Sequence, residues 1–273
     1  MGAHCRWLAR AFVAAKPGAG LHGRVARGDA VMQSFNPSPA MRPRKWDLRP
    51  LRFAGKWHDM ITLVCAASKG GVGKTSFCAN LAVAAEEAGS GPVAILDTDP
   101  QQSLHSWWQL RKVDKPGFCG IRVGLGPTLA ALAETGIALA IVDTPPRLDG
   151  PVPEAVRLAT FVLVPCQPSM LDLGAIGGVI DLAARKPRRP LAFVINRVWG
   201  DTKRGLPADA AIALSQHGTV APVQVGNRVV FSQSMIDGRS AIEVEPGGKG
   251  AAEIRELWSY LAKRIATEVE NGG

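Results

Sequence analysis

Short apolar runs alternate with longer amphipathic stretches along most of this chain. The apolar runs lie at residues 61–67, 93–96, 139–142, 161–164 and 191–195 and are rich in β-branched side chains, which is typical of buried strands. Apolar residues recur at helical spacing in residues 75–88, 152–158, 171–185 and 207–216, and a further strand is expected at residues 220–225. Strands that alternate with helices predict an α/β fold with a doubly wound, mostly parallel sheet flanked by helices.

A glycine-rich segment directly follows the first apolar run. It reads Ser68-Lys69-Gly70-Gly71-Val72-Gly73-Lys74-Thr75, and a helix is predicted from Thr75. Strand, glycine loop and helix in this order indicate a phosphate-binding loop, in which backbone N–H groups at a helix N-terminus converge on phosphate oxygens. We expect Lys74 to reach the β- and γ-phosphates of a nucleotide and the Thr75 hydroxyl to bind Mg²⁺. The predicted nucleotide-binding residues are Gly70, Gly71, Val72, Gly73, Lys74, Thr75 and Ser76.

Carboxylates follow two other predicted strands. One strand ends in Asp97-Thr98-Asp99-Pro100-Gln101 and the other in Asp143-Thr144-Pro145-Pro146. Ligands of an open parallel sheet bind at the carboxyl ends of its strands, so Asp97, Asp99 and Asp143 are expected near the nucleotide. A single Asp after a strand is more commonly a turn former or a helix cap. Here the glycine loop and two acidic strand ends point to the same edge, which favours a site.

These three motifs resemble those of the ParA/MinD family of deviant Walker A ATPases. The phosphate loop departs from the ordinary Gly-x-x-x-x-Gly-Lys-[Ser/Thr] pattern at Ser68 and carries a second lysine, Lys69, as the family's loops do. Asp-x-Asp-Pro-Gln is more similar to the DNA-partitioning ParA branch than to the MinD branch. The resemblance extends over about residues 60–268 and implies the P-loop NTPase fold, ATP and Mg²⁺ as cofactors, and a homodimer that encloses two ATP molecules.

The resemblance also implies a role for each polar residue. Lys69 would reach the nucleotide of the partner subunit and stabilise the charge that shifts during phosphoryl transfer. Asp99 would orient the attacking water, while Asp97 and Asp143 would hold Mg²⁺ mostly through its waters. Asn196, at the end of the strand at 191–195, would recognise adenine. On local grounds Asn196 could equally stabilise the turn that follows its strand.

The positive charge of the chain is concentrated in its first segment. Residues 1–60 contain eleven Lys or Arg and three Asp or Glu, a net charge of +8, so only +1 of the total of +9 belongs to residues 61–273. The segment is rich in Pro and Gly and has no apolar period, which predicts a disordered or loosely folded extension at 1–59 and an ATPase domain at 60–273. The extension is open to three interpretations: an organelle-targeting peptide, a basic arm that contacts nucleic acid, or an error in the assigned start site.

The resemblance implies a cytoplasmic, nucleoid-associated ATPase that partitions plasmid or chromosomal DNA. It would hydrolyse ATP slowly, bind DNA non-specifically and be stimulated by a centromere-binding adaptor protein. Non-specific DNA binding needs clustered basic side chains, each of which could equally be a solvated surface charge. The candidates are Arg185, Lys186, Arg188, Arg189, Lys203, Arg204, Arg228 and Arg239.

Two alternatives remain within the same ATPase class. One is a MinD-like or other cargo-positioning ATPase that acts at a membrane or a protein complex, with the apolar stripe of the helix at 250–269 either entering a membrane surface or packing on its own domain. The balanced charges of that helix favour packing, and no apolar run is long enough for stable membrane insertion. The other is an iron–sulfur-related ATPase, which only Cys119 and Cys166 support, because the five cysteines form no Cys-x-x-Cys pair.

Overall fold

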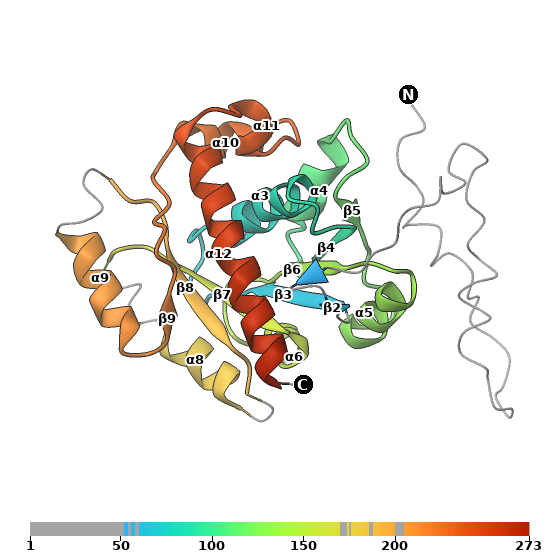
Figure 1. The fold of residues 1–273 in the computed structure, drawn as a ribbon, viewed down its shortest axis with the longest axis horizontal. Helices are drawn as coiled ribbons and strands as arrows, with labels where there is room; N and C mark the ends of the chain where they lie inside the picture. Colours follow the sequence, from blue (N-terminus) through green and yellow to red (C-terminus); the bar gives the residue numbers. More distant parts are fainter. Residues whose placement is uncertain are drawn as a thin grey trace, which may run out of the picture.

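The apolar runs predicted as strands pair side by side in the computed structural model (Figure 1), which describes residues 52–53, 56–57, 60–169, 174, 176–185, 188–199 and 205–272. The long strands are β3 (Ile61–Cys65), β4 (Val93–Asp97), β6 (Leu139–Asp143), β7 (Phe161–Cys166) and β8 (Leu191–Ile195), and the short edge strands are β5 (Gly117–Phe118) and β9 (Thr219–Val220). In the described part of the chain they form a seven-stranded sheet in the order β5-β4-β6-β3-β7-β8-β9. Every pairing in it is parallel, which confirms the predicted fold class.

The central strands are buried on both faces because successive side chains point into two different cores. Leu63 and Cys65 of β3 face one core, which is covered by helices α3 (Lys74–Glu87), α4 (Ser103–Leu110), α11 (Ala241–Val244) and α12 (Lys249–Gly272). Val64 and Ala66 face the other, covered by α5 (Leu125–Glu134), α6 (Val152–Leu158), α8 (Gly177–Ala184) and α9 (Leu206–Ser215). Figure 1 shows α12 crossing the near face of the sheet.

The position of β3 places the phosphate loop at the middle of the carboxyl edge. Strand β3 lies between β6 and β7, with Cys65 opposite Asp143 in the register of β6. On the far side of β6, Asp97 of β4 is the register partner of the same Asp143. Three adjacent strands therefore end beside one another, as predicted for the loop and the acidic motifs.

Two predicted elements differ from the structure. The strand predicted at 220–225 ends at Val220, because after Ala221 the next N–H group to donate to β8 is that of Val225 and not that of Val223, which breaks the regular alternation of the ladder. The N–H groups of Ala221 and Val225 still donate to β8, at 2.8 Å each, so the segment follows the sheet without being a regular strand. The helix predicted at 171–185 is observed as α8 from Gly177, and residues 171–173 and 175 lie outside the described residues. Helices α4, α5, α10 (Val229–Ser234) and α11 were not predicted.

The last helix packs on its own domain. The stripe of Ile254, Leu257, Trp258, Leu261 and Ile265 is at most 3% exposed and belongs to the same core as α3. This confirms packing over membrane contact for these side chains, since a buried stripe cannot enter a lipid surface. In the described residues, no helix combines the length and the apolar character that a membrane span requires.

Part of the predicted extension is described. Strands β1 (Arg52–Phe53) and β2 (Lys56–Trp57) form a short antiparallel pair. The other residues of the extension, up to residue 59, lie outside the described residues, so the predictions made for it stay predictions.

Candidate nucleotide-binding site

Two glycines in left-handed conformations and one asparagine fix the backbone conformation of the glycine loop. Gly71 has φ +74° and Gly73 has φ +102°, conformations that residues with a Cβ atom adopt only at a cost. A Cβ atom on Gly73 would also overlap the side-chain nitrogen of Asn196. That nitrogen donates a hydrogen bond of 2.8 Å to the carbonyl oxygen of Val72. Asn196, which lies 124 positions further along the chain, therefore braces the loop from the end of β8.

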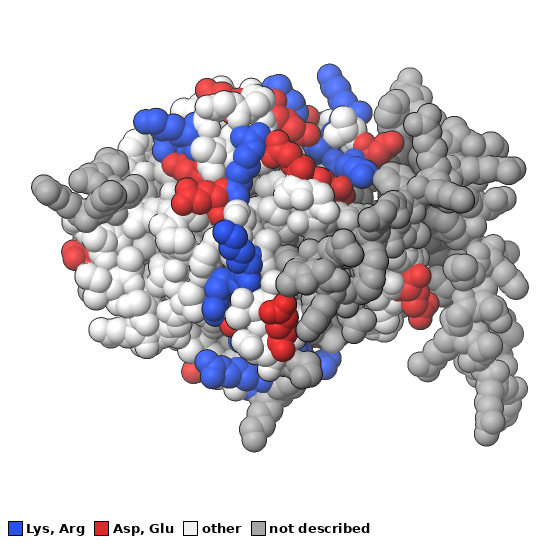
Figure 2. Space-filling model, viewed as in Figure 1, with Lys and Arg blue, Asp and Glu red and all other residues white. Residues whose placement is uncertain are grey.

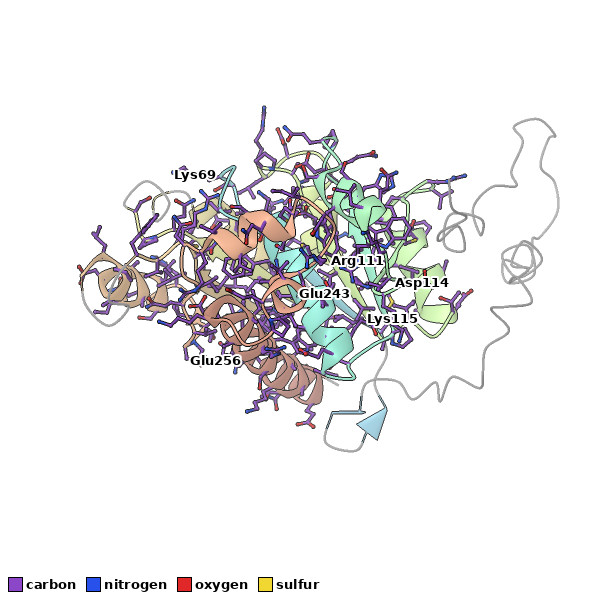
Figure 3. All side chains as sticks on the ribbon, turned by 90° about the horizontal axis from the view of Figure 1, so that it is seen from above. Lys69, Arg111, Asp114, Lys115, Glu243 and Glu256 are labelled. Carbon is purple, nitrogen blue, oxygen red and sulfur yellow. The ribbon has the colours of Figure 1, made fainter. Side chains whose placement is uncertain are left out.

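The two lysines of the loop occupy different environments. Lys74 is 6% exposed, and its Nζ donates to the carbonyl oxygen of Lys69 at 3.4 Å. Burial lowers the pKa of Lys74, while the negative charges of Asp143 and Asp99 oppose that shift. Lys69 is exposed and stands at the edge of the molecule (Figure 3). Lys74 thus lies buried inside the loop, whereas Lys69 lies at the outer surface.

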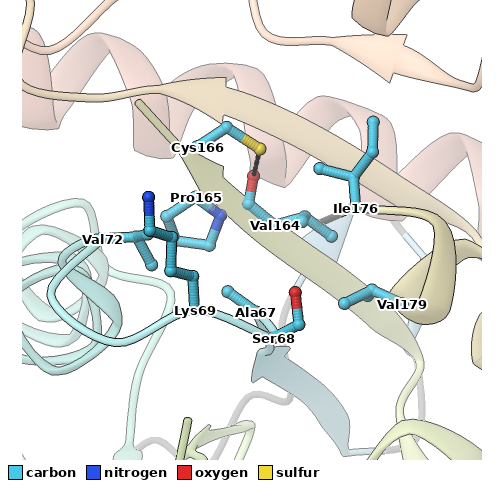
Figure 4. Close-up of a pocket in the computed structure, with 9 residues that line it drawn as sticks. All are labelled: Ala67, Ser68, Lys69, Val72, Val164, Pro165, Cys166, Ile176 and Val179. Atoms are coloured by element: carbon cyan, nitrogen blue, oxygen red, sulfur yellow. Dashed lines mark hydrogen bonds between the residues drawn. The ribbon is translucent and has the colours of Figure 1, made fainter. Parts of the chain in front are cut away.

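The outer side of the loop has a small hollow beside Lys69. Ser68, Lys69, Pro165 and Cys166 are among the residues that line it (Figure 4), and its cavity volume is about 10 Å³. A space of this size holds no more than a single water molecule. It is therefore too small to be a second nucleotide pocket.

Asp143 is the most deeply buried carboxylate of the site. Its side chain is 0% exposed, and Oδ2 accepts a hydrogen bond of 2.6 Å from the hydroxyl of Thr75. Oδ1 is buried and has no hydrogen-bond partner among the described residues. Burial raises the pKa of Asp143 to about 7 against the effect of the Thr75 hydrogen bond, and the nearby charges of Asp97 and Asp99 add to the increase.

These residues fit a bound Mg²⁺ ion. The orphaned oxygen of Asp143 and the clustered negative charges are unfavourable unless a cation offsets them. The Thr75 hydroxyl uses its proton on Asp143, which leaves its lone pairs available to a cation. Among the described residues, no group of three His, Cys, Asp or Glu side chains could hold a metal ion by itself. Such an incomplete protein cage suits Mg²⁺, which typically takes one or two protein oxygens together with waters and nucleotide phosphates.

Asp97 is engaged by backbone groups, whereas Asp99 is largely available. Oδ2 of Asp97 accepts from the N–H groups of Leu104 and His105 at 3.0 and 3.1 Å, in the first turn of α4, and Oδ1 accepts from Asp99 at 3.0 Å. The residue preceding α4, Gln102, supplies no side-chain cap, so Asp97 serves as a cap from a distance. Burial raises the pKa of Asp97 although these backbone donors oppose it.

The carboxylate of Asp99 has fewer backbone contacts. Its Oδ1 accepts one hydrogen bond, of 2.9 Å, from the N–H group of Gln101. The predicted role of Asp99 in orienting water needs a carboxylate oxygen that is free to accept, and this geometry is compatible with that role.

A cavity of about 360 Å³ adjoins the phosphate loop. It is lined by Gly73, Ser76 and Phe77 and, as a wall from another part of the chain, by residues 225–228 together with Phe231 and Met235. Asn196, Arg197 and Ile254 of α12 also line it. The volume and the mixed apolar and polar lining are typical of a small-molecule site. The wall at 225–235 was not predicted from the sequence, where its signal is the Gly226-Asn227 pair after an apolar segment.

Asn196 lines this cavity, but its amide is already bonded to the protein. Besides the bond from its nitrogen to Val72, its Oδ1 accepts from the N–H group of Arg197 at 2.8 Å. These contacts match the alternative that Asn196 stabilises the turn after its strand. Direct recognition of adenine by Asn196 stays a prediction.

The basic residues proposed as DNA contacts have varied surroundings. The side chain of Arg228, a candidate DNA contact, is two-thirds buried and forms an ion pair with Glu253. Arg239 pairs with Asp237 at the surface, and Arg185 and Arg188 are exposed. Lys186, Lys203 and Arg204 lie outside the described residues. On the face seen in Figure 2, basic side chains are interspersed with acidic ones over the described part of the chain.

The four described cysteines are all buried and form no disulfide with one another. They are Cys65, Cys78, Cys119 and Cys166. Burial raises the pKa of Cys119 to about 11, which keeps its thiol protonated, and a protonated thiol is a poor metal ligand.

Comparison with known proteins identifies the family of the chain. Residues 63–238, from β3 through the segment that follows α10, match the model of the CobQ/CobB/MinD/ParA nucleotide-binding domain. The chain belongs to this family. The ParA/MinD resemblance stated from the motifs is thereby confirmed, and the assignment of the loop, the acidic strand ends and the adjoining cavity to the nucleotide stays a prediction.

Two similar proteins share one name. The chain is 40% identical over 200 residues to "Maintenance of carboxysome distribution protein A" of Gloeobacter kilaueensis, covering 72% of this chain and 90% of that protein. It is 28% identical over 207 residues to the protein of the same name from Halothiobacillus neapolitanus, covering 72% and 94%. Among solved structures, the septum site-determining protein MinD of Pyrococcus horikoshii, complexed with Mg-ADP, has a TM-score of 0.59 at 17% identity and covers 77% of this chain and 98% of its own. This structural similarity shows a shared fold.

Proposed function

We propose that this protein is a Mg-ATP-dependent, dimerising ATPase that positions a protein assembly in the cell. The observation that carries the proposal is the placement of the two lysines, with Lys74 buried beside Asp143 and Lys69 exposed on the outside of the same loop. Lys69 is exposed at the surface of its own subunit, where a molecule that covers this face can contact it. A second copy of the chain, with its own nucleotide, would be that molecule.

In this proposal each residue of the site has a separate role in ATP hydrolysis. Lys74 and the loop N–H groups bind the phosphates. Thr75 and Asp143, with Asp97 through metal-bound water, would hold Mg²⁺, which would supply positive charge against the phosphate oxygens. Asp99 orients the attacking water and accepts its proton. Lys69 of the partner subunit stabilises the charge that develops on the transferred group. Hydrolysis removes the γ-phosphate and weakens the contact between subunits, so the nucleotide controls assembly.

The proposed cargo is a protein assembly of the carboxysome kind. The Asp-x-Asp-Pro-Gln motif first favoured plasmid or chromosome partitioning, but the relatives at 40% and 28% identity are both named for carboxysome distribution. They support the alternative of a cargo-positioning ATPase. In this proposal a protein carried by the cargo, rather than a centromere-binding adaptor, stimulates hydrolysis.

The nucleotide part is tested by three purified proteins, the wild type, Lys74→Ala and Lys69→Gln. Mg-ATP binding, dimer mass by light scattering and phosphate release are measured for each. We expect Lys74→Ala to lose Mg-ATP binding and Lys69→Gln to bind Mg-ATP but release little phosphate. Wild-type rates of phosphate release in both variants would contradict the site.

The surface on which the ATPase acts is tested separately. Binding to non-specific duplex DNA and to anionic vesicles is measured with and without ATP at two salt concentrations. Exposed Arg185 and Arg188 support DNA as the surface, and phosphate contacts of this kind weaken steeply as salt rises. ATP-dependent binding to vesicles but not to DNA would show that DNA is not the surface on which the ATPase acts.

A further inference from the structure

A carboxylate of the C-terminal helix binds one wall of the cavity beside the phosphate loop. Helix α12 begins beside α10 and α11 (Figure 1), and its residue Glu253 accepts a hydrogen bond of 3.2 Å from the N–H group of Gly226. The same carboxylate accepts from Nε of Arg228, at 3.1 Å on Oε1 and 3.0 Å on Oε2, and pairs with its Nη2. Glu253 therefore ties together both ends of the three-residue segment 226–228, which lies in the cavity wall.

Two glycines allow this arrangement. A Cβ atom on Gly226 would lie 3.0 Å from Cζ and Nη2 of Arg228, so the guanidinium lies directly against the bare backbone of Gly226. A Cβ atom on Gly250 would lie 2.7 Å from Cγ1 of Val230, so α12 can approach α10 only because residue 250 has no side chain. The sequence thus permits close contact at both points where α12 meets this wall.

Backbone hydrogen bonds also tie this part of the chain to strand β8 and the residues after it. The N–H group of Val225 donates to Ile195 at 2.8 Å, and that of Asn227 donates to Val198 at 2.9 Å. The segment is consequently held both by α12, through Glu253, and by the region around the end of β8. It lines the same cavity as Gly73 and Ser76.

We propose that Glu253 is a positioning residue for the base of the nucleotide, acting through Arg228 and the backbone of Gly226. The inference rests on the proposed function, because it assumes that the phosphates bind at the glycine loop and that the base enters the adjoining cavity. Glu253 contacts the wall and not the phosphates. Its contribution is therefore specific to ligands that carry a base.

The test compares ATP with inorganic tripolyphosphate, which has the phosphates but no base. Affinities of both probes, in Mg²⁺, are measured by calorimetry for the wild type and Glu253→Gln. Loss of the charged hydrogen bonds is expected to weaken ATP binding about tenfold, while tripolyphosphate binding stays within about twofold of the wild type. Glu256→Gln is the matched control, because Glu256 is exposed on the same helix and is expected to change neither affinity.

A second variant covers the case in which Glu253→Gln does not fold. Arg228→Lys keeps the positive charge and the bond between Glu253 and Gly226 but loses the two-pronged guanidinium contact, and it should lower the ratio of ATP to tripolyphosphate affinity in the same direction. If the folded variants bind ATP and tripolyphosphate more weakly by the same factor, the pair of Arg228 and Glu253 supports the domain generally and the inference is overturned. If the folded variants bind both probes as the wild type does, the inference is overturned as well. A wild type that binds neither probe would instead refute the proposed function.

Discussion

The hydroxyl of Thr75, at the start of α3, donates a hydrogen bond of 2.6 Å to Asp143 at the end of β6. The residues are 68 positions apart, and the bond joins the phosphate loop to the neighbouring acidic strand. It orients the lone pairs of Thr75 away from Asp143, while Oδ1 of Asp143 is left without a partner among the described residues. The pair is thus arranged to receive a cation from the nucleotide side.

Removing the hydroxyl should therefore remove the dependence of ATP binding on Mg²⁺. We expect Thr75→Val to bind ATP with similar affinity in Mg²⁺ and in EDTA, whereas the wild type binds at least about tenfold more tightly in Mg²⁺. Thr75→Ser keeps the hydroxyl and is the control, expected to retain the Mg²⁺ effect. Calorimetric titrations of each protein with ATP, in the buffer with Mg²⁺ and in the buffer with EDTA, measure the Mg²⁺ effect. A full Mg²⁺ effect in Thr75→Val would remove Thr75 from the metal site.

Alanine should be tolerated differently at the two left-handed glycines of the loop. Both Gly71→Ala and Gly73→Ala force a Cβ atom into a positive-φ conformation, at about 1–2 kcal/mol. Only the Cβ atom of Gly73→Ala also meets the amide of Asn196, because a Cβ at Gly71 has nothing within 4 Å. We expect Gly73→Ala to lower the urea midpoint more than Gly71→Ala.

A double variant separates strain from overlap at this position. In an Asn196→Ala background the difference between the two glycine variants should shrink, since the overlapping amide is gone. Asn196→Ala itself loses the hydrogen bond to the carbonyl oxygen of Val72. The urea midpoint of each double variant is therefore compared with that of Asn196→Ala alone. Equal effects of both glycine variants in the wild-type background would show that the loop moves away from Asn196.

Asp97 and Asp99 should separate stability from catalysis. Asp97→Ala removes the acceptor of three N–H groups, two of them in the first turn of α4, and is expected to cost about 1–2 kcal/mol of unfolding free energy. Asp99→Ala removes the acceptor of one exposed N–H group and should change stability little. It should retain ATP, hydrolyse it slowly and accumulate as a dimer in light scattering. Normal phosphate release by Asp99→Ala would exclude its proposed role.

The ion pair of Arg111 and Glu243 should make stability depend on acid pH. The Arg111 side chain is 2% exposed and pairs with Glu243 at 2.9 Å. Burial alone would raise the pKa of Glu243, but the hydrogen bonds and charge of Arg111 outweigh it and lower that pKa below its usual 4.5. A lowered carboxyl pKa gives stabilisation that is complete above about pH 4.5 and is lost as the pH falls through the folded-state value.

Glu243→Gln is the variant that tests this dependence. It should be less stable than the wild type by about 2 kcal/mol at pH 7, because a buried guanidinium loses its charged partner, and the gap should narrow in acid. Urea unfolding at pH 7 and pH 3.5 measures both values. Asp237→Asn, in an exposed pair with Arg239, is the control and should have no measurable effect at either pH. A gap that stays constant with pH would contradict the assignment.

The local pattern was sufficient to predict the central strands and the position of the glycine loop between β3 and α3. Strands β3, β4, β6, β7 and β8 are continuous apolar runs because both faces of each are buried, and such runs are visible without a structure. The glycine spacing and the acidic strand ends likewise depend on neighbouring residues alone. Their convergence followed from the general rule that parallel strands present their carboxyl ends at one edge.

The tertiary structure decided the contacts between residues that are distant in sequence. The bracing of Val72 by Asn196, the capping of α4 by Asp97 and the pairing of Arg228 with Glu253 each use polar side chains whose partners no local pattern specifies. Arg228, a candidate DNA contact by its charge alone, was accordingly found paired with Glu253 of α12. The sequence by itself determined which segments form the buried strands and where the glycine loop lies, because apolar runs and glycine spacing are visible in neighbouring residues. Only the folded chain decided which charges neutralise one another and where the base-sized cavity lies, since both depend on how distant segments pack.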